Sequence, residues 1–211
     1  MAVITIAREF GAGGKTLGTK VADKLGYTLI DEEIVEMVAK EANVSPDWVD
    51  SIAKETGSEG FLPRLIKKIG PYRKGYVGIA MEKNPGYIDG DLYISILHNI
   101  IPKIASQDNV IIIGRGGQYI LSDHPNTYHF LMIAKLEHRI TFMMENYNLN
   151  RKQAQIVVDK QDKRRLNLYR YFAKTDYNHP KLYHMVFNMD KVRMEEAVNT
   201  VVQLASGVSA S

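Results

Sequence analysis

The sequence predicts an α/β fold in which a parallel sheet of about five strands is covered by helices on both faces. Short apolar strand patterns alternate with amphipathic helical patterns, and each strand is apolar along almost its whole length. Such strands are typical of parallel sheets, where ligands bind at the carboxyl ends of the strands. With 211 residues, the chain suits a single domain spanning 1–211.

The first half of the pattern holds two strands and their helices. We expect a strand at 3–7, a helix at 14–25, a strand at 27–30 and a helix over 32–42. Gly26 ends the first helix, and Ser45 followed by Pro46 marks a further helix start. Residues 56–90 are rich in glycine and have no regular pattern, so we expect an irregular insertion there.

The second half continues the alternation. We expect helices at 91–105, 136–148, 150–173 and 190–205, and strands at 110–113, 127–134 and 182–189. The stretch VIIIGRGG, residues 110–117, is the strongest strand pattern and runs into glycines, as the first strand does. Both glycine clusters are therefore expected at the carboxyl ends of strands, where such sheets bind ligands.

The stretch ITIAREFGAGGKTLG, residues 4–18, predicts a phosphate-binding loop between a strand and a helix. In such a loop, backbone amides and a helix N-terminus face an anion, a lysine reaches the outer phosphates and a hydroxyl binds Mg²⁺. The residues that match these roles are Gly11, Ala12, Gly13 and Gly14 for the amides, Lys15 for the lysine and Thr16 for the hydroxyl.

Glu9 stands where the full motif has its first glycine, so this is a variant phosphate loop. A purely structural glycine turn is the alternative. Either Lys15 enters the site at a different angle, or Arg8 shares its role.

Three stretches carry a resemblance to a known family. Residues 4–31 resemble the start of the cytidylate kinases, and the opening Arg-Glu-Phe-Gly with its GxGG is closer to the cytidylate kinase-like family. VIIIGRGGQYIL is similar to that family's second glycine-arginine segment, and DKQDKRRLNLYRYF to its lid. The resemblance covers 3–42 and 108–203. It implies a three-layer fold of the P-loop NTPase type, a helical lid at 150–178, and a kinase that uses ATP and Mg²⁺.

Two further residues follow strands and are candidates for catalysis. Arg115 lies between glycines, where its guanidinium can bind a phosphate through two hydrogen bonds; pairing with a neighbouring carboxylate is the alternative. Asp31, by the resemblance, lies near the acceptor, where it orders Mg²⁺-bound water or takes the acceptor's proton. It can also cap the helix over 32–42, and the two roles can coexist.

Basic residues are concentrated in two islands, although the formal net charge is only +3. Residues 64–74 hold five Lys or Arg, and residues 151–174 hold eight. In the second island, basic side chains recur at helical steps over 156–174, as expected for a lid that closes over a phosphoryl group. Arg164 and Arg165 match the lid of the resembled family. Solvated helix faces are the alternative, and in the first island Lys67, Lys68, Arg73 and Lys74 are candidates for an acceptor phosphate.

The composition excludes several classes of protein. The chain has no cysteine, hence no disulfide or thiolate metal site, which fits a cytoplasmic location. The six histidines hold no HxxxH pair, so a protein-caged zinc ion is not expected. No apolar run approaches the roughly 20 residues of a membrane span, and no RNA-recognition motif occurs, so we expect neither membrane nor nucleic-acid partners.

Two functions from different classes follow. The first is a nucleotide-dependent phosphotransferase that moves the γ-phosphoryl group of ATP to a small acceptor such as a nucleoside monophosphate. The second is a non-catalytic nucleotide or phosphate sensor, suggested by Glu9 and by missing acidic neighbours of the glycine-arginine pair. The sequence leaves the acceptor, the base preference and a homodimer open.

Overall fold

The computed structural model describes residues 2–31, 34, 90–172 and 176–207 of the chain. They belong to two compact units: Met1–Leu29 with Asp108–Ser211, and Ile30–Gln107. The expected helix over 32–42 (except residue 34), the helix start at Ser45 and the insertion at 56–90 (except Gly90) lie outside the described residues. The single domain over 1–211 stays a prediction.

The larger unit is built on a parallel sheet with the strand order β2-β3-β1-β4-β5. The strands are β1 Val3–Arg8, β2 Thr28–Ile30, β3 Val110–Ile113, β4 Thr127–Ile133 and β5 Met185–Asn188. In the central strand, Ile6 pairs with Ile113 on one side and with Phe130 on the other. The predicted parallel sheet of about five strands is confirmed.

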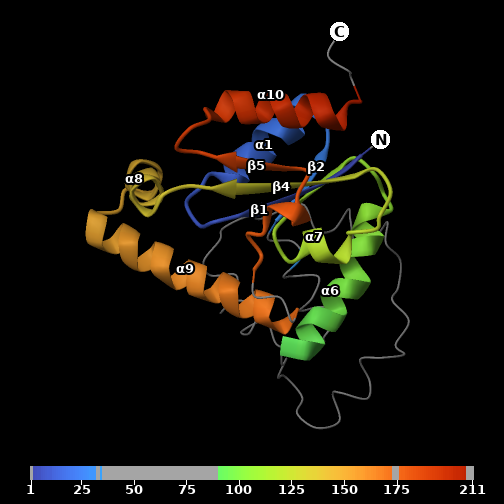
Figure 1. Ribbon diagram of the computed structural model, residues 1–211, viewed down its shortest axis with the longest axis horizontal. Helices are drawn as coiled ribbons and strands as arrows, with labels where there is room; N and C mark the ends of the chain where they lie inside the picture. The colour runs from blue at the N-terminus through green and yellow to red at the C-terminus, as the bar shows by residue number, and fades with distance from the viewer. Residues whose placement is uncertain (1, 32–33, 35–89, 173–175, 208–211) are drawn as a thin grey trace. The chain divides into compact units, whose positions relative to one another are not determined.

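Helices cover both faces of this sheet, as expected (Figure 1). The helices of the larger unit are α1 Gly14–Leu25, α7 Gly117–Ile120, α8 Leu136–Tyr147, α9 Arg151–Tyr171, the 3₁₀ turn η1 Pro180–Leu182, and α10 Met194–Ala205. Helices α1 and α10 lie together on one face and α7 lies on the other. In the smaller unit, α6 spans Gly90–Ala105 with Pro102 inside it. None of the described helices combines the length and apolar character that crossing a membrane requires.

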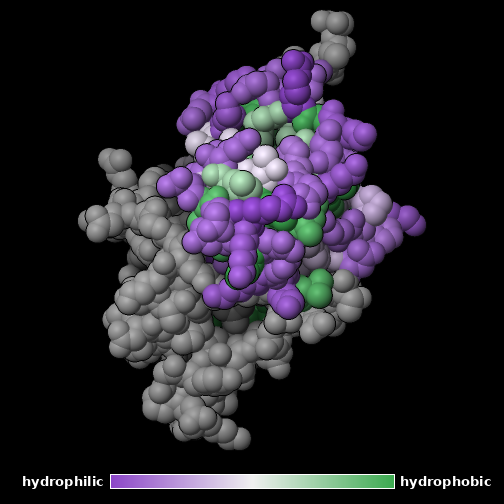
Figure 2. Space-filling view, turned by 90° about the vertical axis from the view of Figure 1, so that its left-hand side faces the viewer, coloured by the Kyte–Doolittle hydropathy of each residue, from purple (hydrophilic) through white to green (hydrophobic). Residues whose placement is uncertain are grey.

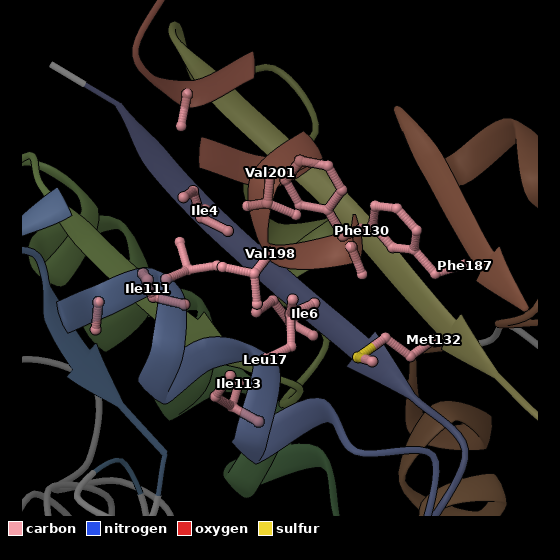
Figure 3. Packing of buried hydrophobic residues seen from close by; sticks show 14 of the residues in the cluster. Ile4, Ile6, Leu17, Ile111, Ile113, Phe130, Met132, Phe187, Val198 and Val201 are labelled. Carbon is pink, nitrogen blue, oxygen red and sulfur yellow. The ribbon is translucent and has the colours of Figure 1, made fainter. Parts of the chain in front are cut away.

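The main apolar core lies between the sheet and the α1–α10 pair (Figure 3). Alternate residues of the strands point to this face because side chains alternate along a strand. The buried core includes Ile4, Ile6, Leu17, Ile111, Ile113, Phe130, Met132, Phe187, Val198 and Val201. Burial of each such side chain stabilises the folded protein by about 1.5–3 kcal/mol. The packed core is therefore a rigid frame for the loops at the strand ends.

Helix α1 approaches the sheet closely just after the first glycine loop. A Cβ atom on Gly18 would be 2.7 Å from Cδ1 of Ile113 and 2.9 Å from Cδ1 of Leu29. These distances are shorter than ordinary carbon contacts, so a side chain at this position would displace the ends of the Ile113 and Leu29 side chains. The absence of a Cβ atom thus lets α1 lie close to the sheet.

The structure differs from the prediction most at two helix and strand starts and in one additional helix. The last helix begins at Met194 rather than at residue 190, because Arg193 is its extended N-cap and donates from N and Nη2 to the Glu196 carboxylate. The last strand begins at Met185 rather than at residue 182, because η1 extends to Leu182. Helix α7 was not expected, since four residues are too short to show a helical period.

Candidate active site

The loop after β1 has the backbone that a phosphate loop requires. Gly11 and Gly13 have φ angles of 81° and 83°, in the left-handed region that glycine adopts without steric cost. Ala12 N donates a hydrogen bond to Glu9 O at 3.2 Å, and Leu17 N donates to Gly13 O at 2.9 Å. The chain therefore turns through the glycines directly into α1.

The N-cap of α1 is Gly13, which has no side chain to cap the helix, and the first turn of α1 holds no acidic residue. Helix α10, by contrast, has Glu195 and Glu196 in its first turn, and Glu196 Oε2 accepts a hydrogen bond from the N-cap nitrogen, Arg193 N, at 2.9 Å. The first N–H groups of a helix lack partners within the helix, and the helix dipole attracts anions there. The exposed Lys15 and the half-buried Thr16 lie in this same turn, so the loop can bind a phosphate.

Glu9, the departure from the motif, is bound at the end of β4. Ala134 N donates to Glu9 Oε2 at 2.9 Å, and Asn178 Nδ2 donates to Oε1 at 3.5 Å. The guanidinium Nε of Arg139 lies 3.8 Å from Oε2. The carboxylate therefore links the base of the loop to the end of β4 and to α8.

The two glycine clusters meet on either side of Arg8. A Cβ atom on Gly14 would be 2.8 Å from Cγ of Arg8, and one on Gly114 would collide with Nη1 of Arg8. Gly114 N also donates to Ile6 O at 2.9 Å, which fixes the second cluster beside β1. Both clusters thus lie at the carboxyl edge of the sheet, as expected, with an arginine between them.

Arg115 occupies an unusual backbone conformation within the second cluster. Its φ is 55°, between 71° at Gly114 and 75° at Gly116. The other non-glycine residues with positive φ in the described part of the chain are Asp108, Asn109, Asn126 and Asn148, which belong to types that tolerate this region. An arginine there costs about 1–2 kcal/mol, and such strain is found most often at functional sites.

The predicted lid is α9, and Arg165 is a half-buried arginine on it. Its side chain is 12% exposed, and Nη1 lies 3.6 Å from Asp162 Oδ1. This buried Nη1 makes no hydrogen bond within the part of the chain that is described. Lys160 and Lys163 are exposed on the same helix, and Arg164 adjoins Arg165 in sequence. Helix α9 therefore provides both a half-buried arginine and exposed basic residues.

The end of the lid packs on the second glycine cluster. The ring of Phe172 lies against Gly116 so closely that a Cβ atom there would collide with it. Tyr169 is buried and stacks on Tyr177 with ring centroids 4.5 Å apart. Burial raises the pKa of the Tyr177 hydroxyl, so this ring remains neutral at ordinary pH.

The remaining predicted site residues are Asp31 and the basic candidates in 64–74. Asp31 directly follows β2, is half-buried and belongs to the smaller unit. The basic candidates in 64–74 lie outside the described residues. The site roles predicted for all these residues stay predictions.

Sequence reasoning missed Arg139 and Asp162. Arg139 is buried on α8 among apolar residues, and its Nη1 donates to Phe10 O at 3.2 Å. Asp162, on α9, accepts a hydrogen bond from Phe10 N at 3.1 Å. One feature of the sequence could have indicated a buried charge here. Arg139 is next to Ile140 and four residues before Met143, so it lies on the apolar face of the expected helix.

The model of the cytidylate kinase-like family matches residues 3–191 of the sequence. The chain belongs to the cytidylate kinase-like family. The resemblance carried by the opening loop, the glycine-arginine segment and the lid is thereby confirmed. No curated protein matches this family member significantly.

Several solved structures are similar to this family member. An uncharacterized protein from Eubacterium ventriosum ATCC 27560 has a TM-score of 0.66 at 19% identity, covering 98% of this chain and 99% of that one. Shikimate kinase from Acinetobacter baumannii in complex with shikimate has a TM-score of 0.49 at 12% identity, covering 100% and 96%. A gluconokinase from Sinorhizobium meliloti 1021 has a TM-score of 0.49 at 11% identity, covering 98% and 93%. The likeness to the Eubacterium ventriosum protein, at 19% identity, concerns the fold alone.

Proposed function

We propose that this protein is a nucleotide-dependent phosphotransferase that moves the γ-phosphoryl group of ATP to a small acceptor such as a nucleoside monophosphate. The observation that carries the proposal is the glycine loop after β1, which opens α1 with a glycine as its N-cap and no acidic residue in the first turn. An anion is the natural partner for such a helix start. Membership of a kinase-like family supports the same function.

The residues present suit ATP with Mg²⁺. Among the described residues, no group of three or more His, Cys, Asp or Glu side chains could hold a metal by itself. Magnesium typically binds through nucleotide phosphates and one or two protein oxygens, and the Thr16 hydroxyl is the candidate here. Bound Mg²⁺ would neutralise charge on the phosphates.

The proposed reaction joins the acceptor to the γ-phosphorus. An acceptor oxygen forms a bond to that phosphorus while the bond to the β–γ bridging oxygen breaks, which releases ADP. Lys15, Arg115, Arg164 and Arg165 are the candidates that stabilise charge on the phosphoryl group, and Arg8 joins them on the strength of its place between the glycine clusters. If the acceptor is a hydroxyl, Asp31 is the candidate that takes its proton.

The test compares Lys15→Ala with Lys24→Ala. Lys24 lies at the opposite end of the same helix and donates to Asn199 Oδ1 at 2.8 Å. Lys24→Ala therefore removes the same charge as Lys15→Ala, but away from the loop. We expect calorimetry to show ATP binding with Mg²⁺ in the wild type, and a coupled assay to show turnover with at least one nucleoside monophosphate or small alcohol. Lys15→Ala should lose most of that turnover and Lys24→Ala should keep it. Absence of binding by both ATP and GTP at millimolar concentration would overturn the proposal.

A non-catalytic nucleotide sensor is the second candidate. It is favoured by Glu9, which replaces the first glycine of the motif and is bound to Ala134 N. A sensor would bind nucleotide without transferring phosphate to any acceptor in the panel. Turnover that disappears in Lys15→Ala would dismiss it. The cytoplasmic location and the lack of nucleic-acid or membrane partners stay predictions.

A further inference from the structure

Side chains from two helices bind both backbone groups of Phe10, the residue before Gly11. Phe10 N donates to Asp162 Oδ1 of α9 at 3.1 Å, and Phe10 O accepts from Arg139 Nη1 of α8 at 3.2 Å. The same Nη1 donates to Asp162 Oδ2 at 2.5 Å. These three contacts close a ring that joins the phosphate loop, α8 and α9.

Arg139 is the fixed member of this ring. It is 9% exposed, and its Nε donates to Ala134 O at 3.1 Å, just beyond β4. Gly11 packs against it, since a Cβ atom there would be 2.9 Å from Arg139 O. Hydrogen bonds between ionised groups are stronger than neutral ones, especially where water is largely excluded. Arg139 is therefore an anchor to which other groups are attached.

Asp162 connects this anchor to the lid. Its side chain is 29% exposed, and it is the only member of the ring that lies on α9. Arg165 follows one helical turn later, with its buried Nη1 3.6 Å from Asp162 Oδ1. One carboxylate therefore faces the loop backbone, the α8 anchor and the lid arginine together.

Hydrophilic side chains cover most of the described surface on the side where α8 and the start of α9 lie (Figure 2). Beneath that surface, α8 and α9 share a small apolar cluster of Ile140, Met143, Ala154 and Val158. On α9, the residues of this cluster, Ala154 and Val158, lie in the first half of the helix. Asp162 is thus the polar attachment beyond it, at the point where the helix passes the loop.

We propose that Asp162 is a positioning residue that fixes the register of α9 on the phosphate loop and thereby sets the place of Arg165. The role of Arg165 toward a phosphoryl group rests on the proposed function, whereas the attachment of α9 to Phe10 does not. Removing the carboxylate charge should weaken the attachment while the glycine loop keeps its own backbone turn. Turnover should then fall more than nucleotide affinity.

The test compares Asp162→Asn with Asp159→Asn, a change of the same type at an exposed position of the same helix. We expect kcat to fall about tenfold to a hundredfold in Asp162→Asn, as for a misplaced catalytic group, with the Kd for ATP changing less than about threefold. Hydrogen exchange in α9 should accelerate about tenfold while exchange in β1 and β4 stays unchanged. Asp159→Asn should match the wild type in all these measurements.

An Asp162→Asn protein with the kcat and the α9 exchange of the control would overturn the proposal. If this variant fails to fold, the test is the hydrogen-exchange rate of the Phe10 amide in the wild type. An amide proton that is donated to Asp162 should exchange far more slowly than the same amide in an unfolded chain. Free exchange of that amide would also overturn it. If the wild type shows no turnover with any acceptor, the proposed function fails, and the exchange measurements still decide whether Asp162 attaches α9.

Discussion

The guanidinium of Arg8 lies against Gly114, while the aliphatic part of the same side chain lies against Gly14. One arginine at the end of β1 therefore separates two glycine loops that are a hundred residues apart in sequence. Because glycine has no Cβ atom, both loops can approach the side chain closely. This arrangement places a positive charge between the loop that opens α1 and the loop that holds Arg115.

Replacing Gly114 by alanine should displace Arg8. The matched control is Gly26→Ala, since Gly26 has a similar φ of 68° but no atom within 4 Å of an added Cβ. Both changes should lower the free energy of unfolding by about 1–2 kcal/mol through backbone strain. Only Gly114→Ala should also weaken ATP binding, by about tenfold or 1.4 kcal/mol. Equal ATP affinities in the two variants, measured by calorimetry, would contradict a role for Arg8.

Arg115 should show separate effects on stability and on activity. Arg115→Asn and Arg115→Ala both remove the guanidinium, but asparagine tolerates the left-handed backbone at φ 55° better than alanine does. We expect both variants to lose phosphoryl transfer to the same extent. Urea denaturation should find the asparagine variant more stable by up to about 1 kcal/mol. Wild-type turnover in either variant would show that Arg115 has no role in phosphoryl transfer.

Loss of Arg139 should be among the most destabilising single changes. Arg139→Ala removes the Arg139 donor from Asp162 Oδ2, Phe10 O and Ala134 O. Breaking a fully buried ion pair from one side costs about 3–5 kcal/mol, and because Asp162 is 29% exposed we expect a loss near about 3 kcal/mol. Arg151→Ala is the control, because Arg151 pairs with Glu137 at the surface and such pairs contribute about 0–1 kcal/mol. If denaturant unfolding shows that Arg139→Ala and Arg151→Ala lose the same free energy of unfolding, Arg139 is not an anchor.

Stability should depend on pH through His129. This ring is buried in β4 and shares a 2.7 Å hydrogen bond with Thr5 Oγ1. Burial, assisted by the neighbouring His184, lowers the pKa of His129 from 6.5 to about 4. Between these two values the unfolded chain binds a proton that the folded protein does not bind. The contribution of neutral His129 to the free energy of unfolding should therefore be complete above pH 6.5. It should fall by on the order of 3 kcal/mol as the pH drops toward 4.

The measurement is the free energy of unfolding at pH 7 and at pH 4. His129→Gln should reduce the difference between the two pH values, whatever it does to stability at pH 7. His124→Gln, at a histidine in the loop before β4, should leave the difference unchanged. An undiminished pH dependence in His129→Gln would assign the effect to other groups.

The prediction from sequence succeeded where local pattern decides structure. The apolar runs of β1 and β3 and the amphipathic period of α1 were sufficient to predict these elements, because burial selects them directly. The glycine loop was also recognisable from local sequence, because left-handed turns need glycine at given positions. The start of α10 at Met194 was not, because its N-cap is Arg193, whose side chain cannot accept the hydrogen bond that the usual N-cap residues accept.

The sequence by itself determined the parallel α/β fold, the two glycine loops at strand ends and the basic helix that follows α8. Only the tertiary structure decided that Glu9 binds the end of β4 and that Arg139 joins Phe10 to Asp162. The contacts of Glu9 and Phe10 link residues more than a hundred positions apart, and no periodic pattern encodes such pairs. They form because charged side chains that folding removes from water must find partners, and the packing of α8 and α9 beside the loop makes these the partners within reach.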